Sequence, residues 1–149
     1  MKYIFIFALF IAFISDSYSG EFQFGVFQGK HMLTQGLHDT HEFAGYESNE
    51  GYGIITYKNS FEIQSYAIYK SFSAKISENL SLNTKIGFTT GYHKIMQYNG
   101  TEYMISMPFV FDGVATIVVP SIDYKHNNHV SSSVSLLGES VNVGITFSF

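Results

Sequence analysis

The chain contains no cysteine, no arginine and no tryptophan, and only two prolines among its 149 residues. Without cysteine, neither a disulfide framework nor a lipid-modified cysteine anchor can form. All eight positive charges are lysines, scattered along a chain whose net charge is −4. Such a distribution provides no basic stripe that could follow a phosphate backbone, so we expect no nucleic-acid partner.

Long apolar runs are also scarce. Tyr3–Ile14 is unbroken and apolar but has only 12 residues, whereas a membrane-spanning helix needs about 20. It follows a lysine and precedes the small residues Ser17 and Ser19, which is the pattern of a secretory signal peptide. We predict that residues 1–19 are a signal peptide cleaved after Ser19, with an uncleaved anchor as the alternative, and that residues 20–149 form one exported domain.

The rest of the chain is rich in aromatic residues and alternates with a period of two. It holds 15 Phe and 11 Tyr, which suits β-sheets and the aromatic girdles of a membrane barrel. Between Leu80 and Tyr92 the even positions are mostly large and apolar, and the odd positions are small or polar. Strand side chains alternate between the two faces of a sheet, so this pattern predicts one lipid-facing side and one lumen-facing side.

The pattern predicts an all-β fold, an eight-stranded antiparallel transmembrane β-barrel of the outer-membrane type. The expected strands are 21–33, 41–47, 51–59, 62–73, 79–93, 102–111, 114–124 and 139–149. Tight turns at 48–50, 75–79 and 112–113 would lie at one end, and mostly longer loops at 34–40, 59–61, 93–101 and 125–138 would lie at the other. Two alternatives stay open: residues 129–136 also alternate enough to form a strand, and a secreted β-sandwich would show similar alternation.

The last nine residues, VNVGITFSF, alternate strictly and end on an aromatic side chain. In a closed barrel the final strand must pair with the first, so it cannot fray. Asn142, Gly144, Phe147 and Phe149 resemble the C-terminal signal by which the assembly machinery of Gram-negative outer membranes recognises its substrates. We therefore expect a monomeric barrel in that membrane, and the Asn-, Ile- and Lys-rich usage is compatible with an AT-rich genome such as that of a bacteriophage.

Under this topology all six histidines would lie near the end with the longer loops, together with Ser60. A serine beside a histidine is the minimum for nucleophilic acyl transfer. The histidine spacings match no familiar ligand set, so we expect neither a metal site nor a cofactor. Both prolines, Pro108 and Pro120, fall inside expected strands, where a missing N–H opens the hydrogen-bond ladder. They would mark a lateral gate through which a lipid chain passes between membrane and lumen.

Several of these segments resemble the lipid A palmitoyltransferase family of outer-membrane enzymes. The similarity lies in YGIITYKNSFEIQSYAIYKSF, in ENLSLNTKIGFTTGY and in MPFVFDGVATIVVP, and it covers roughly residues 50–124 plus the closing strand. The resemblance implies a barrel that moves a palmitoyl chain from a phospholipid donor to a lipid A acceptor.

The resemblance also implies which residues act. Ser60 would lie at the reacting centre, and His38 would assist proton transfer, with His41 as the alternative histidine. Asn59 stands where the family has aspartate, and an amide cannot serve as a base. In this chain Asn59 would instead hold one of the other two by a hydrogen bond.

Two other functions compete with this hypothesis. His129, Ser131 and Glu139 are loosely similar to the His-x-Ser and glutamate of outer-membrane lipid A deacylases. A non-catalytic barrel of the adhesin or surface-exclusion type would use its loop tyrosines, such as Tyr92, Tyr98 and Tyr103, as a contact surface. Asn59 favours this binding-protein hypothesis.

Overall fold

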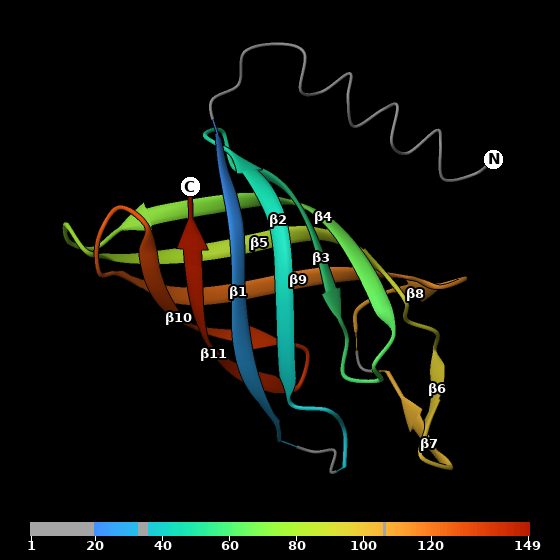
Figure 1. Ribbon diagram of the computed structural model, residues 1–149. Helices are drawn as coiled ribbons and strands as arrows, with labels where there is room; N and C mark the ends of the chain where they lie inside the picture. The colour runs from blue at the N-terminus through green and yellow to red at the C-terminus, as the bar shows by residue number, and fades with distance from the viewer. Residues whose placement is uncertain (1–19, 33–35, 106) are drawn as a thin grey trace.

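The computed structural model describes residues 20–32, 36–105 and 107–149, and the predicted signal peptide lies outside them. Within these ranges, eight strands form a closed antiparallel barrel (Figure 1). They are β1 (Gly20–His31), β2 (Thr40–Ser48), β3 (Tyr52–Lys58), β4 (Gln64–Lys75), β5 (Leu80–Thr90), β9 (Val114–Lys125), β10 (Val130–Leu137) and β11 (Ser140–Ser148). Each pairs with its neighbour in chain order, and β1 pairs with β11 to close the ring. No helix in the described part of the chain is both long and apolar enough to cross a bilayer.

The predicted alternation of faces is present in the barrel wall. On β11 the odd residues point outward, as Val143 and Ile145 do, while Asn142 and Gly144 are buried in the lumen. On β1 the even residues point outward instead. Phe24 is one of them, and it stacks on Phe147 and Phe149 across the closing seam. The last residue is held by backbone hydrogen bonds in both directions with Phe22. Phe149 thus belongs to the closing seam between β1 and β11.

The lumen is divided into a polar part and an apolar part. Towards the end at which β1 begins and β11 ends (the terminal end), Glu47 accepts a hydrogen bond from the Tyr69 hydroxyl at 2.8 Å and pairs with the Lys85 ammonium at 3.2 Å. Towards the opposite end (the loop end), aromatic and aliphatic side chains fill the space in two clusters around Tyr57 and Phe61. The charged side chains Glu47 and Lys85 thus lie near the terminal end of the lumen, and the two apolar clusters lie near its loop end.

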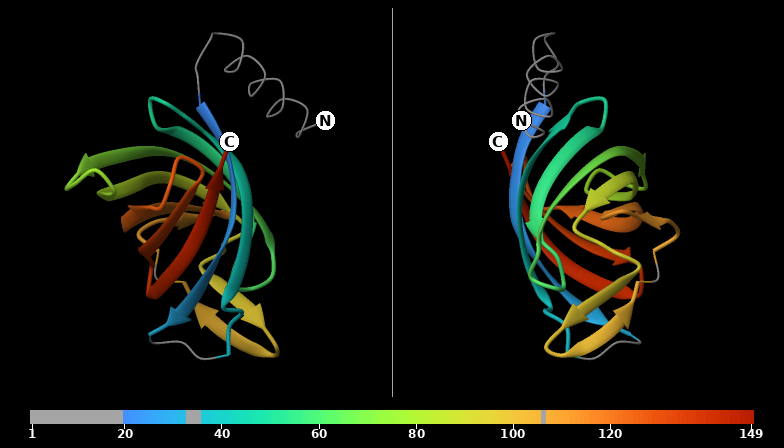
Figure 2. Two further views of the ribbon diagram at one scale, coloured as in Figure 1. Left: turned by 60° about the vertical axis from the view of Figure 1, so that its left-hand side comes forward. Right: turned by 90° about the vertical axis from the view of Figure 1, so that its right-hand side faces the viewer.

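One predicted strand is wrong. Residues 102–111 do not cross the barrel but belong to the long connection between β5 and β9, which forms a hairpin of β6 (Ile95–Tyr98) and β7 (Thr101–Met104) and a short β8 (Val110–Phe111) on the edge of β9. Asn99 and Gly100 both have positive φ and close the hairpin, as Asn-Gly turns do. The hairpin lies at the loop end (Figure 2).

The eighth wall strand is β10, so the open alternative at residues 129–136 is resolved in favour of a strand. This exchange moves the connections. Asp112-Gly113 does form a hairpin turn, but at the loop end and not at the terminal end as predicted. The connection between β9 and β10 is a tight turn at the terminal end, where Nδ1 of His129 donates to the backbone carbonyl of Ser148 at 2.9 Å.

The expectation that all six histidines share one end is therefore also wrong, because His126 and His129 lie in the tight turn at the terminal end. Pro108 lies between β7 and β8, outside any strand, whereas Pro120 lies within β9 as predicted. Residues His129 and Ser131 are at the opposite end of β10 from Glu139, so these three cannot form one deacylase site.

Candidate functional site

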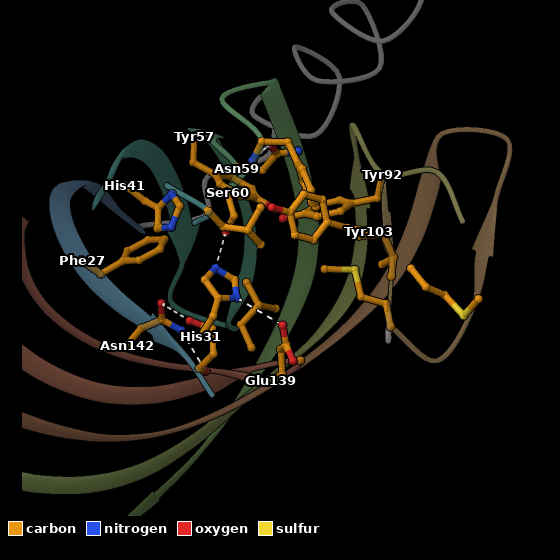
Figure 3. Close-up of a pocket in the computed structure, with 18 residues that line it drawn as sticks. Phe27, His31, His41, Tyr57, Asn59, Ser60, Tyr92, Tyr103, Glu139 and Asn142 are labelled. Atoms are coloured by element: carbon orange, nitrogen blue, oxygen red, sulfur yellow. Dashed lines mark hydrogen bonds and ion pairs between the residues drawn. The ribbon is translucent and has the colours of Figure 1, made fainter. Parts of the chain in front are cut away.

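The serine singled out in the sequence lies against a histidine, inside the barrel at its loop end. Ser60 follows β3, in the turn to β4, and His31 is the last residue of β1, at an inward-facing position. The Nε2 atom of His31 lies 3.0 Å from the hydroxyl oxygen of Ser60 (Figure 3). At this distance the imidazole can take up the hydroxyl proton.

The histidine in contact is thus His31, and not the predicted His38. The backbone amide of His38 donates to the carbonyl of Ser60 at 3.1 Å, so His38 lies next to the site, while its ring packs edge-on against His41. The Nδ1 atom of His41 bonds the carbonyl of Lys58 at 2.8 Å, and its ring also rests on Phe27. Among the described hydrogen bonds, only the ring of His31 reaches the Ser60 side chain.

A carboxylate lies on the far side of the same imidazole. Glu139, in the turn between β10 and β11, places Oε1 3.6 Å from Nδ1 of His31. That nitrogen is buried and has no hydrogen-bond partner within the described part of the chain. The order of groups is therefore hydroxyl, imidazole, carboxylate, contributed by three separate parts of the barrel (Figure 3).

Asn59 is occupied by its own turn. Its side chain is buried, its Oδ1 accepts from the amides of Phe61 and Ile63, and its Nδ2 donates to the Ser65 hydroxyl and the Gly91 carbonyl. These bonds hold the β3–β4 turn in shape. None of them goes to the side chain of Ser60 or His38, so the predicted bond from Asn59 to one of those two is not what its contacts show.

The site borders a small cavity roofed by aromatic side chains. The cavity has a volume of about 60 Å³, and Ser60, His31 and Glu139 line it together with Tyr103. Phe61 packs edge-on against Tyr92, Tyr98 and Tyr103 of the β5–β9 connection. These rings cover the site on the side of the loop end. Burial raises the pKa of the Tyr92 hydroxyl well above its usual value, so this roof residue carries no charge at neutral pH.

A second, larger cavity opens in the wall beside the first. It has a volume of about 560 Å³, and Pro108 and Pro120 both line it. The two strands that flank the opening also contribute to its lining, with Ile117 and Val118 from β9 and Leu136 from β10. Four residues line both cavities: Met107, Leu137, Gly138 and Glu139. The serine-histidine pair is thus adjacent to an apolar opening in the barrel wall.

Pro120 explains why the wall opens at this height. The β9–β10 ladder covers Ser121–Lys125 of β9 and goes no further towards the loop end. The amide of Thr116 donates to Phe109, on the edge of β9 that faces β8 and β10, and the amide of Lys125 donates to Asn79, on the edge that faces β5. Successive amides alternate between the two edges of a strand, so the even residues of β9 direct their nitrogen to the first edge. Position 120 therefore directs its nitrogen at β10, where proline has no hydrogen to donate.

Two members of the site were missed from sequence. His31 is one of the histidines expected near the longer loops, and its odd position on β1 is the sequence signal that places its side chain in the lumen. The sequence relates Glu139 only to His129 and Ser131. It comes near His31 only because β11 pairs with β1, opposing Ser140 to His31. No group of three or more His, Cys, Asp or Glu side chains suitable for a metal ion occurs among the described residues.

Comparison with known proteins supports the fold and leaves the activity open. No protein-family model and no curated protein matches the chain. A designed transmembrane β-barrel superposes with a TM-score of 0.56 at 14% identity, over 87% of this chain and 96% of the other. The fold is that of a membrane barrel. The N-terminal barrel domain of OprF from Pseudomonas aeruginosa matches with a TM-score of 0.52 at 7% identity, over 88% and 100%.

A third similar structure is Ail, the attachment invasion locus protein of Yersinia pestis, solved with the heparin analogue sucrose octasulfate. It matches with a TM-score of 0.42 at 16% identity, over 88% of this chain and 99% of Ail. A specific relation to lipid A palmitoyltransferases does not emerge from these matches.

Proposed function

We propose that this barrel transfers an acyl chain from a phospholipid to a second lipid, with Ser60 as nucleophile and His31 as general base and acid. The observation that carries the proposal is the 3.0 Å contact between His31 Nε2 and the Ser60 hydroxyl, inside a barrel and beside an opening in its wall. A structural serine-histidine pair would need no access from the membrane, whereas an enzyme acting on lipids does.

The chemistry divides into two half-reactions. Ser60 attacks the carbonyl carbon of the donor ester as its proton passes to His31, and the tetrahedral species expels the glycerol oxygen of the lysophospholipid, which takes that proton from His31. The resulting acyl-serine is attacked by a hydroxyl of the acceptor, whose proton passes through His31 back to Ser60. No proton or electron is left over, so the cycle needs no cofactor.

The two cavities suggest where the donor lies. About 60 Å³ next to Ser60 suffices for an ester group but not for a long hydrocarbon chain. The wall cavity of about 560 Å³ is apolar and would take the chain, with Pro108 and Pro120 at its border as the predicted lipid gate. The sequence resemblance suggests a palmitoyl donor and lipid A as acceptor, in the outer leaflet of the outer membrane.

The proposal is tested with the folded barrel in detergent micelles, using phosphatidylcholine with labelled palmitate as donor and lipid A as acceptor. Mass spectrometry should show one added palmitoyl group on lipid A. Ser60→Ala and His31→Asn should each reduce the rate by roughly 10³-fold or more. His38→Asn should lose much less, because the His38 ring does not contact Ser60.

The chain offers a matched control. His126 Nε2 lies 3.0 Å from the Ser132 hydroxyl, the same spacing as in the site, but at the exposed terminal end. His126→Asn should therefore leave the rate unchanged. If folded wild-type protein transfers no acyl chain, or if Ser60→Ala keeps its activity, the enzyme hypothesis fails, and a binding protein that presents its loops becomes the better explanation.

A further inference from the structure

Residue 59 is asparagine, whereas the enzymes that this sequence resembles have aspartate there. A carboxylate for this site would therefore have to come from another residue. An imidazole that acts as a base needs one ring nitrogen free to accept and the other protonated. A carboxylate beside the protonated nitrogen selects that tautomer and stabilises the imidazolium that forms. Position 59 cannot supply it, because Asn59 is an amide whose donors and acceptor are all engaged.

We propose that Glu139 is the positioning residue of this site, which makes Ser60, His31 and Glu139 a relay assembled from the β3–β4 turn, β1 and the β10–β11 turn. This inference rests on the proposed function. The carboxylate thus comes from the β10–β11 turn, whereas the sequence resemblance suggests position 59 in the β3–β4 turn.

The geometry around His31 supports this role. Nε2 faces the Ser60 hydroxyl, so Nδ1 is the atom that must carry the proton if Nε2 is to accept one. Nδ1 is buried and lacks a hydrogen-bond partner in the described part of the chain, and Glu139 Oε1 stands 3.6 Å away. A hydrogen bond requires a separation of about 3.2 Å or less, so a shift of roughly half an ångström would satisfy the imidazole. Contacts of catalytic groups often tighten in this way when substrate binds.

Backbone pairing holds Glu139 close to the His31 imidazole. Ser140, its neighbour in β11, opposes His31 in the β1–β11 ladder, which holds Glu139 at the level of the imidazole. The backbone carbonyl of Glu139 also accepts the amide of Met32, the residue after His31. Glu139 lines both cavities as well. An acyl chain seated in the wall opening would thus lie against the turn that carries the carboxylate.

The test measures the reactivity of Ser60 without any lipid substrate. An alkyl fluorophosphonate phosphonylates base-activated serines: the serine oxygen bonds to phosphorus, fluoride leaves, and the hydroxyl proton passes to the histidine. Labelling of the folded barrel is followed by intact mass, and the labelled peptide is identified. We expect Glu139→Gln to lower the maximal labelling rate by roughly 10²- to 10⁴-fold, with the half-saturating probe concentration unchanged.

Chemical rescue separates positioning from a structural effect. Glu139→Ala should lose reactivity similarly and regain at least part of it when formate is added, because the small carboxylate can occupy the adjoining cavity. Chloride at equal ionic strength should have no effect. Glu102→Gln, on the exposed β6–β7 hairpin, serves as the control, and the mobility of unheated protein in gel electrophoresis confirms that each variant is folded.

The outcomes distinguish the two proposals. A wild-type barrel whose Ser60 is not labelled overturns the proposed function. A labelled wild type, with Glu139→Gln reacting at the same rate, overturns the role of Glu139 and leaves the function standing. A folded Glu139→Ala variant that reacts slowly but is not rescued by formate also overturns it, since the residue would then act only through packing.

Discussion

At the scale of single residues, Asn59 shows how a buried amide can hold the turn that presents a candidate reactive side chain. The side chain uses both donor directions and its acceptor in the turn that presents Ser60. An aspartate could accept from the same two amides but could not donate to Gly91 or Ser65. The amide is therefore required by the contacts of this turn, whatever the residue does in proteins of similar sequence.

This leads to a prediction for Asn59→Asp. The buried carboxylate would face the Gly91 carbonyl without a proton between them, and we expect the free energy of unfolding to fall by roughly 2–5 kcal/mol. Urea unfolding of the micelle-bound barrel measures it. Asn127→Asp is the control, because that exposed side chain only accepts a hydrogen bond, from the amide of His129. A stable Asn59→Asp protein with higher transferase activity would contradict our interpretation and favour a catalytic acid at position 59.

At the scale of elements, the important feature is a ladder that ends early. β9 is paired with β5 over its whole length except the last residue, but with β10 only from Ser121 to Lys125. Its other end is covered on the same edge by β8, through Val110 and Phe111. The unpaired stretch between these two partners is where the wall cavity lies. The β5–β9 connection thus roofs the site and also frames the opening.

We predict that Pro120→Val closes this opening. Valine restores an amide that faces Leu136, and a net gain of about 0.5–1.5 kcal/mol in unfolding free energy is expected from one further backbone hydrogen bond. Acyl transfer should slow because the donor chain loses its place. Ile122→Val, an outward position within the intact ladder, should change neither quantity. A Pro120→Val variant that is more stable and equally active would show that lipid does not use this opening.

At the scale of the whole molecule, the outer surface is apolar to a degree that water does not tolerate. In seven of the eight wall strands, all except β2, the outward-facing side chains include large exposed hydrophobic residues, for example Phe22, Ile68, Ile86, Val118 and Val143. Monomeric soluble proteins rarely expose continuous apolar surfaces of this extent. Apart from the short unpaired stretch of β9 beside the wall cavity, the wall strands are paired on both edges, so most of their backbone is satisfied without water.

The barrel should therefore require a membrane or its substitute. We expect the chain spanning residues 20–149 to aggregate in detergent-free buffer and to insert into phosphatidylcholine vesicles, where unheated and heated samples migrate differently in gel electrophoresis and the folded form resists trypsin. A monodisperse, β-rich monomer in buffer alone would contradict this prediction, and with it the lipid substrate.

Seven of the eight wall strands follow from residue alternation. A side-chain period of two is a local property of an extended segment and does not depend on which strands pair with it. The error at 102–111 has a physical cause. That segment also alternates, and it does form extended structure, but its partners are β6 and the edge of β9. Periodicity indicates that a segment is extended and does not say which strand it joins.

What the sequence by itself determined is the barrel and its seam, because these depend on patterns along the chain. What only the tertiary structure decided is the relay. His31 and Glu139 are far apart in sequence and meet because β11 returns to pair with β1, placing Ser140 opposite His31. Ser60 joins them across the lumen from a third connection. Closure of the ring brings these groups together, and closure is a property of the whole chain that no local pattern contains.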